Sequence, residues 1–295
     1  MYSAEVQAAI SEDVFSWLDK RRASGIEELA RAELLDYRFG KRLIPLVDRN
    51  RGIRNPAEFD ATLSILTSPT GPYDDIAGAD GLVHYAYRDG DPYTGDNRKL
   101  RRAMELGVPL VYFQGVRAGY YVPVYPVYVV GDDLKRRTFA IALDKSLTFL
   151  PNPLQITADT RSYAERMVRQ RLHQPMFRAQ VIHAHDRSCA VCHLHHPDLL
   201  DAAHILPDSA HAGIPVVSNG LALCKIHHAA YDRNLLGITP DHEVRINAEL
   251  LAEVDGPMLR HGLQEMHGST ITLPKRRAER PSRDALAVRF AEFVA

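Results

Sequence analysis

The placement of the three cysteines constrains this chain more than any other feature of its sequence. Cys189 and Cys192 are separated by two residues, and Cys224 is followed at the same interval by His227. Two such pairs are the spacing of a zinc ribbon, in which each short loop presents two ligands to a tetrahedral Zn²⁺. Three unrelated buried thiols are the alternative interpretation. Because the chain has no other cysteine, we predict that these four residues hold a structural zinc, with the histidines between 193 and 196 as alternative ligands.

A second set of polar residues overlaps the first. Adjacent side chains on a helix diverge by about 100°, so the neighbouring His227 and His228 cannot serve one metal ion. Asp232 lies one turn beyond His228 and therefore shares its face of the helix. An imidazole and a carboxylate in this arrangement predict an open site for a hard or borderline cation.

The segment from Cys189 to Asp232 resembles the HNH nucleases, whose finger of two strands and a helix is pinned by an optional zinc. Besides the cysteine pairs, the resemblance is carried by Ala202-Ala-His-Ile-Leu-Pro, by Asn219 and by Leu223-Cys-Lys-Ile-His-His. It implies a zinc-stabilised ββα-metal fold that hydrolyses phosphodiesters.

The resemblance also implies roles for single residues. His204 would be the general base that deprotonates the attacking water, a task that suits the near-neutral pKa of histidine. Asn219 would hydrogen-bond the loop backbone and hold His204 in position. His228 would bind a catalytic Mg²⁺ or Mn²⁺ at the scissile phosphate.

The chain departs from this family at one position. Many members carry Asp or His directly before the base histidine, where this chain has Ala203. One ligand of the catalytic ion is therefore missing, and Asp232, or else Asp201, is the expected substitute. The alternative is that His204 and His228 are zinc ligands or packing residues.

Length and composition set broader limits. A chain of 295 residues, 45% apolar and 25% charged, is typical of a globular protein with two domains or one large one. No apolar run approaches the roughly 18–20 residues needed to cross a bilayer, and no signal peptide is visible. Free thiols and a zinc site favour a reducing cytoplasm.

Charge is neutral overall but unevenly distributed. The net charge of −1 does not favour a nucleic-acid partner. Five arginines nevertheless fall between positions 161 and 178, and five basic residues between 275 and 283. Such local clusters either contact phosphates or are solvated helix faces.

The region before the zinc motif carries a second pattern. A loop rich in glycine and aspartate presents Tyr73, Asp74 and Asp75, and a predicted strand follows at 82–87. Alternation along that strand places Tyr85 and Tyr87 on one face. Aromatic rings beside a carboxylate can hold a nucleobase, although tyrosines on strands usually serve packing.

Residues 40–145 resemble the SRA domains that flip 5-methylcytosine out of duplex DNA. The resemblance rests on the Tyr73 loop, the following aromatic strand, and a helix and strand predicted at 97–106 and 108–113. It implies that Tyr73 and Tyr85 sandwich the base while Asp75 reads its polar edge. The alternatives for these positions are Asp74, His84 and Tyr87.

These patterns predict an α+β protein with two domains. The first, residues 1–152, is expected to be an SRA-like curled β-sheet or barrel with flanking helices, and the second, residues 153–295, the zinc-stabilised HNH domain. Further helices are predicted at 3–22, 26–35, 162–172, 175–185, 259–267 and 285–294. Further strands are predicted at 43–47, 63–67, 139–143, 236–239, 243–246 and 271–274, with two short proline-interrupted strands within 119–130.

Together, these patterns favour a modification-dependent DNA endonuclease. Its partner would be double-stranded DNA carrying 5-methylcytosine or a related base. One HNH site cuts one strand, so a homodimer is expected. The alternatives are an HNH nuclease that recognises another DNA feature, a non-cleaving reader with a purely structural zinc finger, which Ala203 favours, and a metal-dependent RNase.

Overall fold

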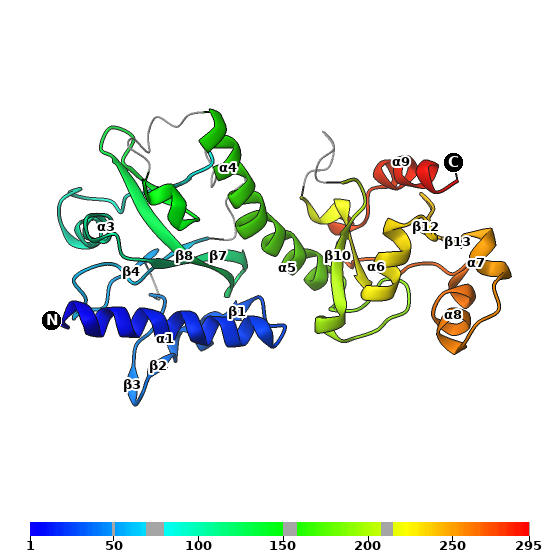
Figure 1. Ribbon diagram of the computed structural model, residues 1–295, viewed down its shortest axis with the longest axis horizontal. Helices are drawn as coiled ribbons and strands as arrows, with labels where there is room; N and C mark the ends of the chain where they lie inside the picture. The colour runs from blue at the N-terminus through cyan, green and yellow to red at the C-terminus, as the bar shows by residue number, and fades with distance from the viewer. Residues whose placement is uncertain (49–50, 69–79, 150–157, 208–214, 295) are drawn as a thin grey trace. The chain divides into compact units, whose positions relative to one another are not determined.

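Figure 1 shows the computed structural model of the chain, which describes residues 1–48, 51–68, 80–149, 158–207 and 215–294. The chain forms two compact units, Met1–Pro175 and Met176–Ala295. The division falls later than the boundary expected between residues 152 and 153. The reason is that α4 (Ala158–Val168) and the π-helical turn after it (Arg169–His173) bury Val168 and Leu172 in a core of the first unit.

Within the described residues, the first unit is built on a seven-stranded curled sheet: six strands follow in the order β4-β5-β7-β8-β9-β6, and the seventh, β1, pairs with β8. Strands β5 and β7 are parallel, and the other pairs are antiparallel. The strands are β1 (Leu29–Ala30), β4 (Ile53–Arg54), β5 (Ser64–Thr67), β6 (Val83–Ala86), β7 (Leu110–Arg117), β8 (Tyr120–Asp133) and β9 (Thr138–Ala142).

Strand β8 gives the sheet its curl. Its first part pairs with β7 and its second part pairs with β9, and register shifts interrupt both ladders. Such irregularities bend a strand and increase its twist. The prediction of two short strands in this region is wrong. Val122 and Val124 on either side of Pro123 are buried and pair with β7. Tertiary packing therefore keeps the strand continuous across its prolines.

The two faces of the sheet are covered by different helices. Alternate residues of β7 point to opposite faces, so Phe113 packs with α1 (Ala4–Ala23), whereas Tyr112 packs with α3 (Gly95–Leu106) and the end of the α4 segment. Helix α1 runs along its face of the sheet (Figure 1) and buries Ile10 and Val14 one turn apart.

Three local predictions are wrong. The helix expected at 26–35 is reduced to α2 (Arg31–Leu35), because Leu29–Ala30 pairs with β8 instead. The strand expected at 43–47 is replaced by a short hairpin of β2 (Arg38–Phe39) and β3 (Arg42–Leu43), after which the apolar residues are buried without sheet pairing. The expected edge strand at 271–274 is absent from the described residues, where a single bridge joins Glu243 and Thr270.

The second unit contains a finger of two strands and a helix. Strands β10 (Leu200–His204) and β11 (Gly220–Cys224) form an antiparallel hairpin, and α6 (Lys225–Asp232) follows β11 directly. The helix before the finger is α5 (Gln174–Ala184). After the finger come β12 (Leu236–Ile238), β13 (Val244–Ile246), α7 (Ala248–Ala252), α8 (Pro257–Gly262) and α9 (Arg283–Val294). The mixed helix-and-sheet class predicted from the sequence is confirmed. In the described parts of the chain, the helices are too short or too polar to cross a membrane.

A close backbone approach in the first unit can be tested at Gly52. A Cβ atom at this position would fall onto the Tyr85 hydroxyl and lie 3.0 Å from the Leu66 carbonyl oxygen. We therefore expect Gly52→Ala to lower the free energy of unfolding by about 1–3 kcal/mol, measured by chemical denaturation. Gly256→Ala is the control, because a Cβ there meets nothing within 4 Å. Equal stability of the two variants would contradict the described packing.

Candidate functional site

The finger brings its four candidate zinc ligands together through local structure. Cys224 ends β11 and is the residue before the first turn of α6, so His227 lies one turn away on the same helix. The loop of Cys189 and Cys192 is fastened to β11 by a hydrogen bond from the Ala190 amide to the Ala222 carbonyl at 2.7 Å. The hairpin therefore places the two ligand pairs against each other.

The ligand atoms of Cys189, Cys192, Cys224 and His227 all lie within 4.8 Å of one another. The Nδ1 atom of His227 is 3.4 Å from the Cys189 sulfur and 3.1 Å from the Cys224 sulfur. On the other side of the ring, Nε2 lies 2.7 Å from the Gly262 carbonyl oxygen. A carbonyl can only accept, so Nε2 carries a proton, and Nδ1 is the ring nitrogen that faces the cysteines.

The electrostatics of this cluster suit a cation. Hydrogen bonds from Cys192 and Cys224 hold the pKa of the Cys189 thiol far below its usual range. Burial lowers the pKa of His227, but its contacts with Cys189 and Cys224 outweigh burial and raise that pKa to about 10. Thiolate charge in a buried site requires a compensating cation, and three sulfurs with one nitrogen are a donor set that Zn²⁺ prefers. The cluster could therefore hold a zinc ion.

His204 and Asn219 lie at the end of the hairpin where the loop between its two strands begins and ends. His204 is the last residue of β10, and Asn219 ends the short 3₁₀ turn Val217–Asn219 that precedes β11. The Asn219 side chain accepts from the Leu206 amide and donates to the Leu206 carbonyl, both at 3.0 Å. The backbone carbonyl of Asn219 accepts from the Ile205 amide at 2.9 Å. Asn219 thus fixes the backbone directly after His204.

His228 has surroundings different from those of its neighbour His227. Its Nδ1 lies 3.2 Å from Asp201 Oδ2, and its Nε2 lies 3.4 Å from Asp232 Oδ2. Lys225 forms an ion pair with the other oxygen of Asp201. Partial burial raises the pKa of Asp201, but the hydrogen bonds from Lys225 and His228 outweigh it and lower that pKa overall. The ring of His228 therefore lies between two carboxylates.

The predicted base-binding residues are only partly described. Tyr73 and Asp75, and the alternative Asp74, lie outside the described residues. Tyr85 lies in β6 with only 8% of its surface exposed, and its hydroxyl donates to the Leu66 carbonyl at 3.0 Å. Burial raises the pKa of this hydroxyl. The Tyr85 ring is thus almost fully buried in the core of the sheet and is held in place by its hydrogen bond to Leu66.

The other two alternatives are also engaged. The ring of His84 lies 2.8 Å from the Asp80 carboxylate. The hydroxyl of Tyr87 donates to Asp132, which also pairs with Arg101. Both side chains are therefore held by carboxylates in the structure.

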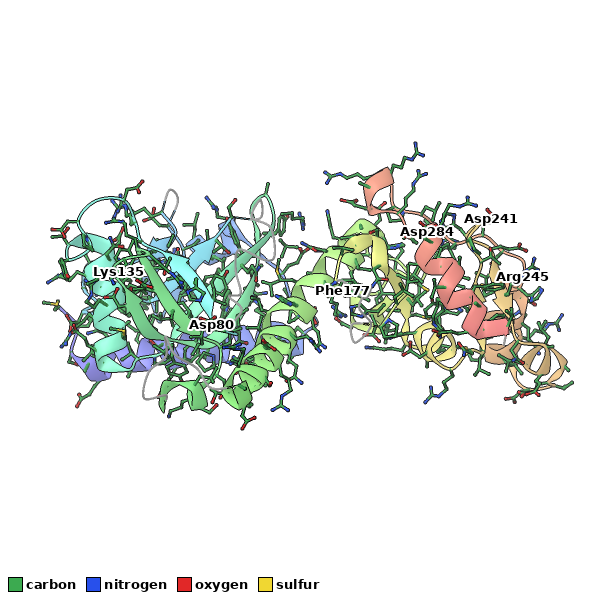
Figure 2. The ribbon with its side chains drawn as sticks, turned by 90° about the horizontal axis from the view of Figure 1, so that it is seen from above. Asp80, Lys135, Phe177, Asp241, Arg245 and Asp284 are labelled. Carbon is green, nitrogen blue, oxygen red and sulfur yellow. The ribbon has the colours of Figure 1, made fainter. Side chains whose placement is uncertain are left out.

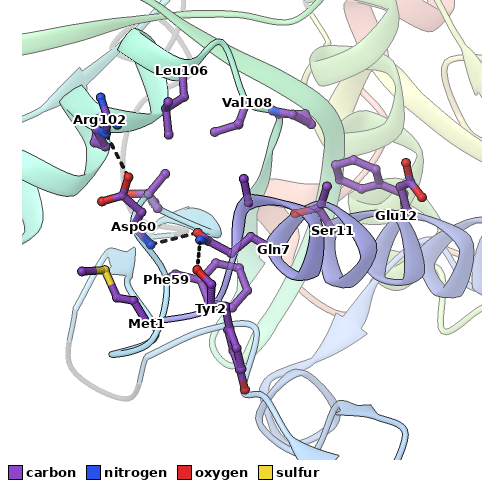
Figure 3. Close-up of a pocket in the computed structure, with 16 residues that line it drawn as sticks. Met1, Tyr2, Gln7, Ser11, Glu12, Phe59, Asp60, Arg102, Leu106 and Val108 are labelled. Atoms are coloured by element: carbon purple, nitrogen blue, oxygen red, sulfur yellow. Dashed lines mark hydrogen bonds and ion pairs between the residues drawn. The ribbon is translucent and has the colours of Figure 1, made fainter.

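A cavity of about 510 Å³ lies elsewhere in the first unit, between α1, residues 59–62 and the end of α3 (Figure 3). At its rim, Arg102 pairs with Asp60 at 3.0 Å, and the Asp60 amide donates to Gln7 at 2.8 Å. None of the residues that line this cavity is a site residue predicted from the sequence.

Two contacts of the site were not predicted from the sequence. The Gly262 carbonyl that fixes the His227 tautomer is far along the chain, and no motif marks it. Phe177 on α5 stacks on the His204 ring. The only available signal was the pairing of Phe177 with Val181 at helical spacing, which indicates a buried face but not its partner.

The divergence of the two adjacent histidines yields a test of the zinc site. We expect about one zinc per chain by elemental analysis, lost in His227→Ala and in Cys224→Ser because each change removes a ligand. His228→Ala should retain the zinc, since that ring faces Asp201 and Asp232. Loss of zinc from both histidine variants would contradict this assignment.

Comparisons with known proteins agree with the geometry of the finger. A family model described as HNH endonuclease matches residues 189–239. No curated protein matches the chain.

Two solved structures share low similarity with the chain. The modification-dependent TagI restriction endonuclease is 19% identical, with a TM-score of 0.31, over 82% of this chain and 85% of that chain. The Type IV phosphorothioation-dependent restriction endonuclease ScoMcrA is 17% identical, with a TM-score of 0.24, over 62% of this chain and 48% of that chain. The match at residues 189–239 covers the whole finger, and the chain therefore carries an HNH endonuclease domain.

Proposed function

We propose that the protein is a modification-dependent DNA endonuclease. In this proposal the first unit recognises a modified cytosine, 5-methylcytosine or a related base, and the second unit hydrolyses the DNA backbone. The observation that carries the nuclease half is the divergence of His227, which faces the cysteines, from His228, which faces two carboxylates. One short helix, α6, would thereby supply one ligand to a structural metal centre and one to a catalytic metal centre.

In the proposed hydrolysis, His204 takes the proton of the water that attacks the phosphate. Asn219 holds the backbone after His204 and so limits where its imidazole can move. His228 and a carboxylate would hold a Mg²⁺ or Mn²⁺ ion, which would supply positive charge to neutralise the charge that develops on the phosphate and the leaving oxygen. His204, Asn219 and His228 all belong to the hairpin and the helix that follows it, so this one element sets the distances between them.

Asp232 is the better candidate for the ligand missing at Ala203. A histidine that binds a metal usually donates its second ring N–H to a carboxylate, which fixes the ring orientation. Asp201 suits this orienting role, because it is only 24% exposed and already balanced by Lys225. Asp232 is 61% exposed beside Nε2 and can present its oxygen to an ion from solvent. We therefore assign Asp232 as the ligand and Asp201 as the orienting carboxylate.

This assignment predicts different effects of two isosteric changes on Mn²⁺ binding, measured by calorimetry on the zinc-loaded protein. Asp232→Asn should abolish measurable binding at the catalytic site, whereas Asp201→Asn should weaken it by about 10- to 100-fold. Asp241→Asn is the control, since Asp241 only pairs with Arg283 at an exposed position. The reverse order of the two effects would make Asp201 the ligand.

The recognition half of the proposal rests on the first unit. Its curled sheet and flanking helices suit the resemblance of residues 40–145 to base-flipping SRA domains. Tyr73 and Tyr85 would hold the flipped base, and Asp75 would accept from its polar edge. Tyr85 is held by its bond to Leu66, so it would form the immobile side of such a pocket.

Assembly follows from the chemistry. One HNH centre cuts one strand, so a double-strand break requires two copies of the site. We propose that the chain acts on DNA as a homodimer, with each copy cutting one strand.

One experiment tests recognition and cleavage together. Methylated and unmethylated duplexes of the same sequence are incubated with the protein and Mg²⁺ or Mn²⁺, beside His204→Ala. We expect cutting of the methylated duplex alone and at least 100-fold slower cutting by the variant, because a general base contributes about 10²–10⁴-fold. Equal cutting of both duplexes would show that another DNA feature is read. Binding of methylated DNA without cutting would make the protein a reader.

A further inference from the structure

We propose that Phe177 is a positioning residue for His204, which it holds by face-to-face stacking in the orientation needed to accept a proton from water. The proposal rests on the proposed role of His204 as general base. Phe177, labelled in Figure 2, comes from α5, outside the finger itself. The inference therefore extends the catalytic machinery beyond the HNH motif.

The contact between the two rings is close and nearly parallel. Their centroids are 4.0 Å apart, and their planes differ by 14°. Phe177 is buried, with 2% of its surface exposed, so its own ring is fixed by the core. Such a pair restricts rotation of the imidazole about its ring bond.

The approach of α5 depends on a glycine opposite the histidine. Gly220 is the cross-strand partner of His204 in the hairpin. A Cβ atom at Gly220 would lie 2.8 Å from the tip of the Phe177 ring and would collide with Val181. The missing side chain thus leaves the space that the α5 residues fill. Arg178 also anchors the helix, donating to the Leu200 carbonyl of β10 at 2.6 Å.

Stacking suits a general base for a chemical reason. The proton-accepting lone pair of imidazole lies in the plane of the ring, so a partner on the ring face occupies neither nitrogen. Asn219 fixes the backbone after His204, and Phe177 fixes the plane of its ring. Misplacement of a catalytic group by about 1 Å can cost about 10²-fold in rate.

The second unit offers a matched control for ordinary packing. Phe293 of α9 lies over Gly237 of β12, where an added Cβ would be 2.5 Å from the Phe293 ring. This is the same kind of contact, a phenylalanine against a strand glycine, but without a histidine beneath the ring. Phe293→Leu therefore reports the effect of losing such packing alone.

The test compares Phe177→Leu and Phe177→Met with Phe293→Leu, in the full chain with zinc bound. Cutting by the unchanged protein is established first, and kcat and KM are then measured for variants that retain zinc and unfold cooperatively. We expect about 10- to 100-fold lower kcat for the Phe177 variants with KM nearly unchanged. Phe293→Leu should keep its kcat. Equal kcat in the two leucine variants would overturn the proposal. An unchanged protein that cuts no DNA would instead refute the proposed function.

A second measurement needs no cleavage. In protein labelled at histidine, the ring protons of His204 are identified by their absence in His204→Ala. Stacking against Phe177 should shift them upfield in the unchanged chain, and Phe177→Met should remove this shift. Ring-proton shifts of His204 that do not change between the two proteins would also overturn the proposal.

Discussion

The rest of the candidate site depends on the buried cluster of three sulfurs and one imidazole. The Gly262 carbonyl fixes the proton of His227 on Nε2, so that Nδ1 faces the cysteines. Once that ring is held inside, the geometry of the helix turns His228 outward toward Asp201 and Asp232. A metal at the first centre would therefore orient the ligand of the second, although no atom is shared between them.

The hairpin is held from a second side by packing. Gly220 leaves room for α5, and through this gap Phe177 reaches the His204 ring. Asn219 holds the loop between the strands by two hydrogen bonds to Leu206. Backbone hydrogen bonds and aromatic stacking thus act on different parts of one small hairpin, and a metal ion held by the cysteine cluster would act on a third. This combination suits the proposed role of His204 as general base, for which small displacements are costly.

The fold was predictable where the signal was local. Helical spacing located α1, α3 and α9, and strand patterns located β5, β6 and β9, to within a few residues. The errors arose where distant contacts outweighed local preference. The prolines of β8 suggested an interruption, but buried neighbours pairing with β7 keep the strand continuous. Leu29 and Ala30 fit a helix locally, yet they pair with β8 at the sheet edge.

The sequence by itself determined which residues can bind metal, because ligand spacing within a loop or a helical turn is a local property. The resemblance of the segment from Cys189 to Asp232 to the HNH nucleases rests on such spacing, and the family model that matches residues 189–239 agrees with it. Only the tertiary structure decided what lies against each of these residues. Asp201 reaches His228 across 27 positions, and Phe177 reaches His204 from another helix. Such partners are selected by the packing of whole elements, and short-range spacing in a sequence does not record them.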